Sequence, residues 1–297
     1  MTRITLLDGG TGRELKRIGA PFRQPEWSAL ALIEAPEFVS RVHEAYVAAG
    51  ADVITTNSYA IVPFHLGAAR HASDGRRLAA LSGSLAREVV NRATRPVHVA
   101  GSLPPVCGSY RADLFDPAVA RPLLETLVEA LRPNIDHWQG ETLSAIEEAA
   151  LIRAVVGDDG KPLWLSFTVA DGAASSATPC VRSGEPVADA VRAALDLGAA
   201  AVLFNCSQPE VMGAAVDAAS EVIARTGASA RVGVYANAFP PQRADAEANE
   251  DLLAIRADLT PAGYLGWARD WVNRGAGIVG GCCGIGPEHI AELRAAL

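Results

Sequence analysis

One stretch near the carboxyl end decides how this chain is interpreted: Ile278-Val279-Gly280-Gly281-Cys282-Cys283-Gly284. Residues 278–281 form a short apolar run that predicts a buried strand. Adjacent α-carbons lie about 3.8 Å apart, shorter than a relaxed disulfide spans, so the two neighbouring thiols are poorly suited to bond to each other. Strand side chains alternate between faces, so both sulfurs reach one ion only where glycines let the chain turn. The stretch therefore predicts a strand that ends in a soft-metal site, completed by a distant cysteine.

Seven other short β-branched runs alternate with alanine-rich amphipathic stretches, the pattern of βα units around a parallel sheet. Together with the last run, the expected strands are residues 4–8, 52–57, 97–102, 136–142, 163–169, 201–206, 232–237 and 278–281. Helical patterns follow them, several opening on a proline that suits a first helical turn, at residues 117–131, 144–156, 187–197, 209–225, 261–273 and 287–297. Eight repeats in 297 residues predict a single (β/α)8 barrel domain over residues 1–297.

An open doubly wound sheet is the alternative fold. The glycines after the first expected strand, Gly9-Gly10-Thr11-Gly12, do not match the dinucleotide fingerprint GxGxxG, which favours the barrel. Residues 238–258, rich in Pro, Ala, Asp and Glu, are expected to form a long loop before the last pair of helices.

Composition excludes several classes of protein. The formal net charge of −8 and the lack of a basic cluster argue against a nucleic-acid partner. No apolar run approaches the roughly 20 residues that cross a bilayer, and the first residues lack the apolar core of a signal peptide, so we expect a cytoplasmic protein. Five unevenly spaced cysteines do not resemble a disulfide framework, and in a reducing compartment they are metal ligands, catalytic groups or buried thiols.

Cys206 lies at the carboxyl end of the sixth expected strand, whereas Cys282 and Cys283 lie at that end of the eighth. In a (β/α)8 barrel this rim carries the active site. Three thiolates with a fourth position open to substrate are the arrangement expected of catalytic zinc. The alternative is that these cysteines are small buried apolar groups. Cys107 and Cys180, in loops after the third and fifth expected strands, are expected to be bystanders.

These residues resemble the zinc-dependent homocysteine S-methyltransferases, which include the betaine and S-methylmethionine enzymes and the homocysteine-binding module of methionine synthase. The family signature is Asn-Cys near the sixth strand, here Asn205-Cys206, and Gly-Gly-Cys-Cys-Gly at the eighth, here residues 280–284. The resemblance spans nearly the whole chain, and its weaker parts are Leu6-Leu7-Asp8-Gly9-Gly10, Trp27-Ser28-Ala29, residues 50–59, Gly140-Glu141-Thr142 and Val234-Tyr235-Ala236-Asn237.

The resemblance implies a role for each remaining candidate. Asp8 and Glu141 would hold the α-ammonium of homocysteine, although helix capping or a solvated loop charge is the alternative. Thr56 would bind the substrate carboxylate, unless it only reflects strand propensity. Trp27 would offer an indole face to an onium methyl donor, and otherwise packs in the core. Asn237 would line the zinc site or form a turn.

The implied reaction transfers a methyl group from an onium donor to the homocysteine thiolate and yields methionine. The chain shows no folate or cobalamin modules and no long carboxyl-terminal extension, so S-methylmethionine is the favoured donor, then S-adenosylmethionine, then betaine. His137 has the wrong spacing for a cobalamin motif. The alternatives are another thiol or selenol acceptor on the same zinc, or a zinc-holding, redox-sensing protein without turnover. The sequence leaves the oligomeric state open.

Overall fold

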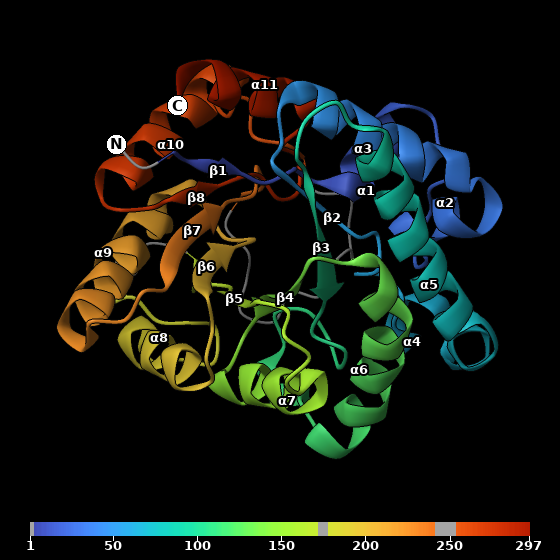
Figure 1. The fold of residues 1–297 in the computed structure, drawn as a ribbon, viewed down its shortest axis with the longest axis horizontal. Helices are drawn as coiled ribbons and strands as arrows, with labels where there is room; N and C mark the ends of the chain where they lie inside the picture. The colour runs from blue at the N-terminus through green and yellow to red at the C-terminus, as the bar shows by residue number, and fades with distance from the viewer. Residues whose placement is uncertain (1–2, 172–177, 241–253) are drawn as a thin grey trace.

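A computed structural model describes residues 3–171, 178–240 and 254–297. In this part of the chain eight parallel strands pair in the order β1-β8-β7-β6-β5-β4-β3-β2. An isolated parallel bridge between Leu7 and Val53 joins the two outer strands, so the sheet closes into a barrel (Figure 1). The strands are β1 (Thr5–Leu6), β2 (Val53–Thr55), β3 (His98–Leu103), β4 (His137–Leu143), β5 (Leu163–Phe167), β6 (Ala201–Asn205), β7 (Arg231–Tyr235) and β8 (Ile278–Val279).

Helices form a ring outside the strands, as Figure 1 shows in the view down the barrel. The α-helices are α1 (Thr11–Arg17), α2 (Ser28–Glu34), α3 (Pro36–Ala49), α4 (Pro63–Leu66), α5 (Ala68–Arg92), α6 (Pro117–Leu131), α7 (Ile146–Val156), α8 (Val187–Asp196), α9 (Pro209–Thr226), α10 (Pro261–Asn273) and α11 (Pro287–Ala296). Two 3-10 turns, Ala112–Leu114 and Arg132–Asn134, flank α6. The prediction of a (β/α)8 barrel is confirmed.

Local chemistry accounts for the helix starts that the sequence predicts. Proline occupies the first turn of α6 and α10, and the residue before each helix caps it: Asp116 accepts from the amide of Ala118 at 2.8 Å, and Thr260 from that of Gly263 at 3.2 Å. Helix α7 begins two residues later than expected. The buried Glu148 carboxylate accepts the amides of the two residues that precede the helix and so satisfies them outside it.

The buried apolar side chains form two layers, one outside the strands and one inside the barrel. The larger layer lies between helices and strands, as helix-covered parallel sheets require. Inside the barrel, buried side chains form the smaller cluster of Leu7, Val53, Ala100, Ala201, Leu203, Tyr235 and Ile278. The rings of Trp164 and His137 contact each other near the amino ends of β5 and β4, with centroids 4.0 Å apart and planes tilted by 37°. The carboxyl ends of the strands are left to carry polar groups.

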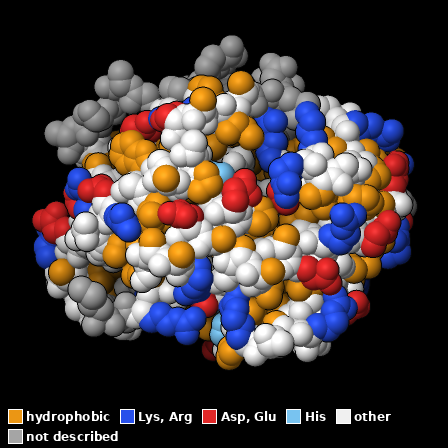
Figure 2. Space-filling view, turned by 90° about the horizontal axis from the view of Figure 1, so that it is seen from above, with side chains coloured by type: hydrophobic (Ala, Val, Ile, Leu, Met, Phe, Trp, Pro, Cys, Tyr) orange, Lys and Arg blue, Asp and Glu red, His pale blue; other side chains and the backbone are white. Residues whose placement is uncertain are grey.

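All eight expected strands are found, although β1, β2 and β8 have half the predicted length or less. Of the expected loop at residues 238–258, residues 241–253 lie outside the described part of the chain, and the rest contains no helix or strand. Figure 2 shows one face of the molecule, on which basic and acidic side chains are interspersed. Among the described helices, none has both the length and the apolar character that a bilayer crossing demands.

Candidate active site

The three cysteines singled out from the sequence converge at the carboxyl-terminal rim of the barrel. Cys206 follows β6 directly, and Cys282 and Cys283 follow β8 after two glycines. Their sulfur atoms all lie within 4.8 Å of one another, and the Cys206 and Cys282 sulfurs are 2.8 Å apart. Three thiolates around tetrahedral zinc sit about 3.8 Å from each other, given Zn–S bonds of about 2.3 Å. The cluster therefore has the size and the donor type of a zinc site.

A turn brings the two adjacent cysteines to the same side, as their glycine frame predicts. The amide of Ile285 donates to the carbonyl of Cys282 at 3.1 Å, and Gly284 has φ of +84°. This is the position of a tight turn at which glycine avoids a Cβ clash. Gly10 has a different reason: a Cβ there would lie 2.6 Å from the Cys282 carbonyl oxygen, so only glycine lets β1 and β8 approach.

Electrostatics show why this cluster suits a cation. Hydrogen bonds from Cys206, and then from Cys282, hold the pKa of the Cys283 thiol well below its usual range. Contacts with Cys206 and Cys283, together with burial, raise the pKa of Cys282 well above its usual range. Burial and the neighbouring sulfurs thus oppose three negative charges in this cluster. Holding three thiolates together requires a positive ion between them.

Two buried carboxylates face the same end of the barrel. Asp8 accepts hydrogen bonds from the amide of Thr55 at 2.7 Å and from its hydroxyl at 3.0 Å. Burial, opposed by those bonds and reinforced by the charge of Glu141, raises the pKa of Asp8 to about 7. Burial likewise raises the pKa of Glu141 to about 6, and the Cys206 charge adds to the effect. Neither carboxylate has an ion-pair partner among the described residues, so both suit a bound cation.

Glu141 is held in place by polar neighbours. It accepts hydrogen bonds from Ser102, from Gln139 at 3.4 Å and from the Tyr235 hydroxyl at 3.3 Å. The pairing of β4 with β5 shifts register between Gly140 and Leu143, a bulge that redirects the residues within it.

Asn205 fixes that bulge. Its side chain binds Thr142 on both sides, accepting from the Thr142 amide at 2.9 Å and donating to the Thr142 hydroxyl at 2.9 Å. Thr142 has φ of +59°, which an L-residue adopts only when its surroundings hold it. The two residues of the Asn-Cys motif therefore have different functions. Asn205 orients the strand that carries Glu141, and Cys206 supplies a sulfur to the cluster.

Trp27 lies in an aromatic group rather than alone. It precedes α2, and its ring centroid is 6.1 Å from that of Tyr59 in an edge-on contact and 6.0 Å from that of His65 in a stacked one. The Tyr59 hydroxyl hydrogen-bonds to Ser109 at 2.7 Å, and burial, followed by the charge of Cys206, raises the pKa of Tyr59 well above its usual range. No separate role was predicted for Tyr59 from the sequence.

Thr56 and Asn237 are buried at the rim, and their substrate roles remain predictions. The Thr56 hydroxyl oxygen accepts from the Ser102 amide at 3.0 Å and lies 2.8 Å from the Ser58 hydroxyl, so it already has protein partners. The Asn237 side-chain oxygen accepts from the amide of Phe239 at 3.1 Å. Its buried Nδ2 has no hydrogen-bond partner among the described residues, which leaves a donor available at the site.

Several other residues at the rim were not predicted as site residues from the sequence. Tyr110 donates a hydrogen bond to the Cys206 sulfur at 3.0 Å, and the Arg182 guanidinium carbon lies 4.7 Å from the centre of the Tyr110 ring. Tyr110 and Cys206 are separated by 96 residues, so no local pattern connects them. Tyr235 is the last residue of β7, and this position at the carboxyl end of a barrel strand was the one sequence feature that could have indicated a role at the site. Cys107 and Cys180 do not belong to the cluster, and each thiol donates a hydrogen bond to a nearby backbone carbonyl.

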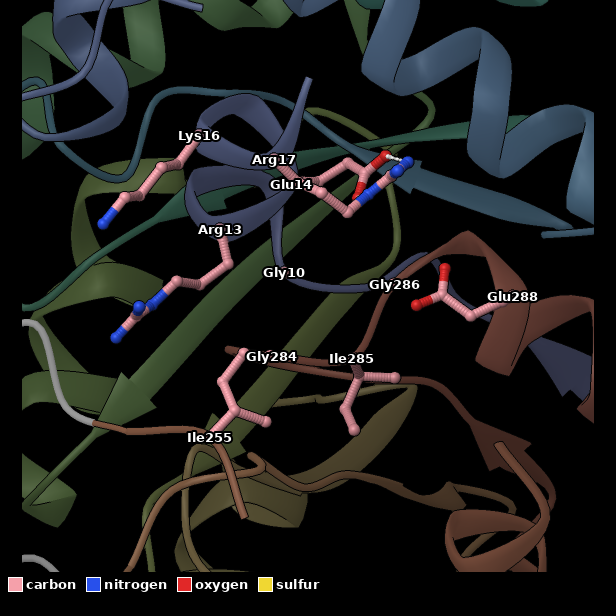
Figure 3. Close-up of a pocket in the computed structure, with 10 residues that line it drawn as sticks. All are labelled: Gly10, Arg13, Glu14, Lys16, Arg17, Ile255, Gly284, Ile285, Gly286 and Glu288. Atoms are coloured by element: carbon pink, nitrogen blue, oxygen red, sulfur yellow. Dashed lines mark hydrogen bonds and ion pairs between the residues drawn. The ribbon is translucent and has the colours of Figure 1, made fainter. Parts of the chain in front are cut away.

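A cavity of about 340 Å³ opens beside the cluster, between α1 and the loop after β8 (Figure 3). Arg13 and Lys16 extend from α1, and Glu288 extends from α11. None of the predicted site residues lines this cavity, since their side chains are largely buried in the barrel mouth. Its lining residues are Gly10, Arg13, Glu14, Lys16, Arg17, Ile255, Gly284, Ile285, Gly286 and Glu288.

Known proteins resemble this chain over its whole length. The sequence model of the family described as homocysteine S-methyltransferase matches residues 5–297. Homocysteine S-methyltransferase YbgG of Bacillus subtilis is 32% identical to the chain, with 98% of this chain and 94% of YbgG covered. The selenocysteine methyltransferase of Astragalus bisulcatus is 25% identical, with 98% and 91% covered.

A solved structure shares the same barrel. The homocysteine methyltransferase MmuM from Escherichia coli, in its metallated form, superposes with a TM-score of 0.77 and is 26% identical, covering 99% of this chain and 96% of MmuM. The resemblance therefore extends to the region of the three cysteines and two carboxylates.

Proposed function

The chain belongs to the homocysteine S-methyltransferase family and is a methyltransferase, and from that premise we propose that it methylates homocysteine to methionine at a zinc ion. The observation that carries the proposal is the placement of three convergent sulfurs beside two buried carboxylates at one rim. A thiol amino acid carries the matching pair of groups, a sulfur for the metal and an ammonium for the carboxylates. A zinc-holding or redox-sensing protein would need the sulfurs alone.

Cys206, Cys282 and Cys283 would hold the zinc, since their sulfurs form the one described group of this size and softness. When bound, zinc removes the proton of a substrate thiol and keeps the resulting sulfur nucleophilic at neutral pH. Three protein sulfurs would leave a coordination position for that substrate sulfur.

Asp8 and Glu141 would bind the ammonium of homocysteine between them. Burial raises the pKa of both carboxyls, and the charge of Glu141 adds to the effect at Asp8, so a cation that enters between them offsets the cost of both charges. Ser102, Gln139 and Tyr235 fix the orientation of Glu141, and Thr55 fixes that of Asp8. The amino acid is thereby oriented before any methyl donor arrives, which supplies much of the acceleration.

The methyl donor is proposed to be a sulfonium. Trp27 and Tyr59 offer aromatic faces that would attract an onium group. S-methylmethionine ranks first, S-adenosylmethionine second and betaine third. A second acceptor, a selenol or another thiol, is favoured by the similarity to the Astragalus selenocysteine methyltransferase.

Metal analysis followed by turnover tests the proposal. Reduced protein should hold about one zinc per chain and convert homocysteine to methionine with S-methylmethionine. Selenocysteine and cysteine serve as competing acceptors, and S-adenosylmethionine and betaine as competing donors. Turnover with selenocysteine but not with homocysteine would show that the acceptor is a selenol. Strong activity with betaine and none with a sulfonium would show that the donor is betaine. Zinc binding without turnover in any combination would favour the sensor.

A further inference from the structure

A closed circuit of side-chain and backbone contacts runs through the sulfur of Cys206. Tyr110, from the loop after β3, donates its hydroxyl hydrogen to that sulfur at 3.0 Å. The guanidinium of Arg182 lies over the Tyr110 ring at 4.7 Å and pairs with Asp171 at 2.9 Å. Asp171 in turn accepts the backbone amide of Gln208 at 2.9 Å, two residues beyond Cys206. The circuit thus leaves the chain at the Cys206 side chain and rejoins it at the Gln208 backbone, two residues later.

This circuit is buried and holds its members in unusual conformations. Tyr110 is 8% exposed, and the side chains of Arg182 and Asp171 are 5% and 0% exposed. Tyr110 and Cys206, at the two ends of the O–H···S contact, have φ of +68° and +54°. Such backbone persists only where surrounding contacts over-determine it. The hydroxyl is therefore held at the sulfur by structure rather than by chance rotation of a surface side chain.

The contact matters because a methyl donor would meet several sulfurs. Under the proposed function, on which this inference rests, three cysteine sulfurs lie within 4.8 Å of one another beside the substrate sulfur. Any of them could take the methyl group and inactivate the site. A hydrogen bond to a charged acceptor occupies a lone pair and is lost or weakened when that lone pair forms a new bond.

We propose that Tyr110 is a positioning residue that lowers the nucleophilicity of Cys206, so that the methyl group goes to the substrate sulfur and not to the protein. Arg182 supports it, because a cation above the phenol ring holds the ring in place and favours the hydroxyl as a donor. Asp171 fixes Arg182 and links this pair to the backbone beyond Cys206.

Alkylation of the zinc-loaded protein by iodoacetamide tests the proposal. A cysteine sulfur attacks the methylene carbon with its lone pair, the S–C bond forms, the C–I bond breaks and iodide leaves. Tyr110→Phe keeps the ring and its contact with Arg182 and removes only the O–H group. We expect initial labelling of Cys206, followed by peptide mass spectrometry, to become about tenfold faster. Labelling of Cys282 and Cys283, and the zinc content, should stay at wild-type levels.

Tyr46→Phe is the matched control. It removes a buried hydroxyl that donates to the Ile285 carbonyl at 3.0 Å, near the cluster but not at a sulfur, so cysteine labelling should match wild type. In the cobalt-substituted proteins, the sulfur-to-metal charge-transfer bands should shift for Tyr110→Phe and not for Tyr46→Phe.

Two results would overturn the inference: unchanged Cys206 labelling in Tyr110→Phe, or an equal rise at all three cysteines, which indicates a general opening of the site. The labelling uses neither homocysteine nor a methyl donor. A wild-type protein that transfers no methyl group would therefore count against the proposed function alone. The labelling rates would still test whether Tyr110 lowers the nucleophilicity of Cys206.

Discussion

Replacing Glu141 by Gln should weaken homocysteine binding and at the same time stabilise the protein. The substitution removes the charge and keeps the shape, and the buried Gln139 side-chain oxygen, which lacks a partner among described residues, can accept from the new amide. Losing one member of a buried charged pair costs about 2 to 5 kcal/mol. Asp8 still faces the ammonium, so we expect about 2 to 3 kcal/mol, an increase in Kd of about 30- to 150-fold.

The stability change follows from the raised pKa of Glu141. Its pKa is about 6 in the folded protein against an ordinary 4.5. Because the folded state binds the proton more tightly, ionised Glu141 opposes folding above its folded pKa, by about 2 kcal/mol for a difference of this size. Glu141→Gln should recover up to that amount near pH 8. The gain should vanish as the pH falls below the unfolded pKa, where the carboxyl is protonated in both states.

Calorimetric titration of zinc-loaded protein with homocysteine, together with urea unfolding at two pH values, measures both effects. Glu148→Gln is the matched control, since Glu148 is equally buried with a pKa raised to about 7 but binds the amides before α7 instead of facing the cluster. Its homocysteine Kd should not change. A Kd for Glu141→Gln within about threefold of wild type, less than 0.7 kcal/mol, would show that the ammonium binds elsewhere.

Three further outcomes are expected. Cys206→Ser should lose most of its zinc while Cys107→Ser keeps it, and mass-spectrometric metal content that is equal in both would remove Cys206 from the site. Homocysteine affinity should fall as the pH is lowered from about 8 to about 5, because protons compete with the ammonium at Asp8, whose pKa is about 7, and at Glu141, whose pKa is about 6; a flat profile would contradict this role. Trp27→Ala should raise KM for S-methylmethionine about 2- to 30-fold, the range of a cation–π contact, and leave the Kd of homocysteine unchanged; an equal loss of both would indicate general damage.

The amino-acid sequence by itself determined the barrel and which three cysteines meet at its rim. Each strand and helix depends on the periodicity of neighbouring residues and on prolines and caps at helix starts, which are local properties, and α6 and α10 begin and end where their patterns predict. The cysteines could be placed at one rim because parallel strands in a barrel all end on the same side. The positions of Asp8 and Glu141 at the same rim follow from that argument, whereas their proposed role came from the family resemblance.

The tertiary structure alone decided what surrounds those cysteines. Asp8 is bound by Thr55 across 47 residues, and Tyr110 reaches Cys206 across 96. Such contacts depend on how loops of different lengths fold over the closed barrel, and no repeat in the sequence records that geometry. The raised pKa values of the two carboxylates have the same origin, because burial is a property of the assembled barrel and is not carried by any one segment.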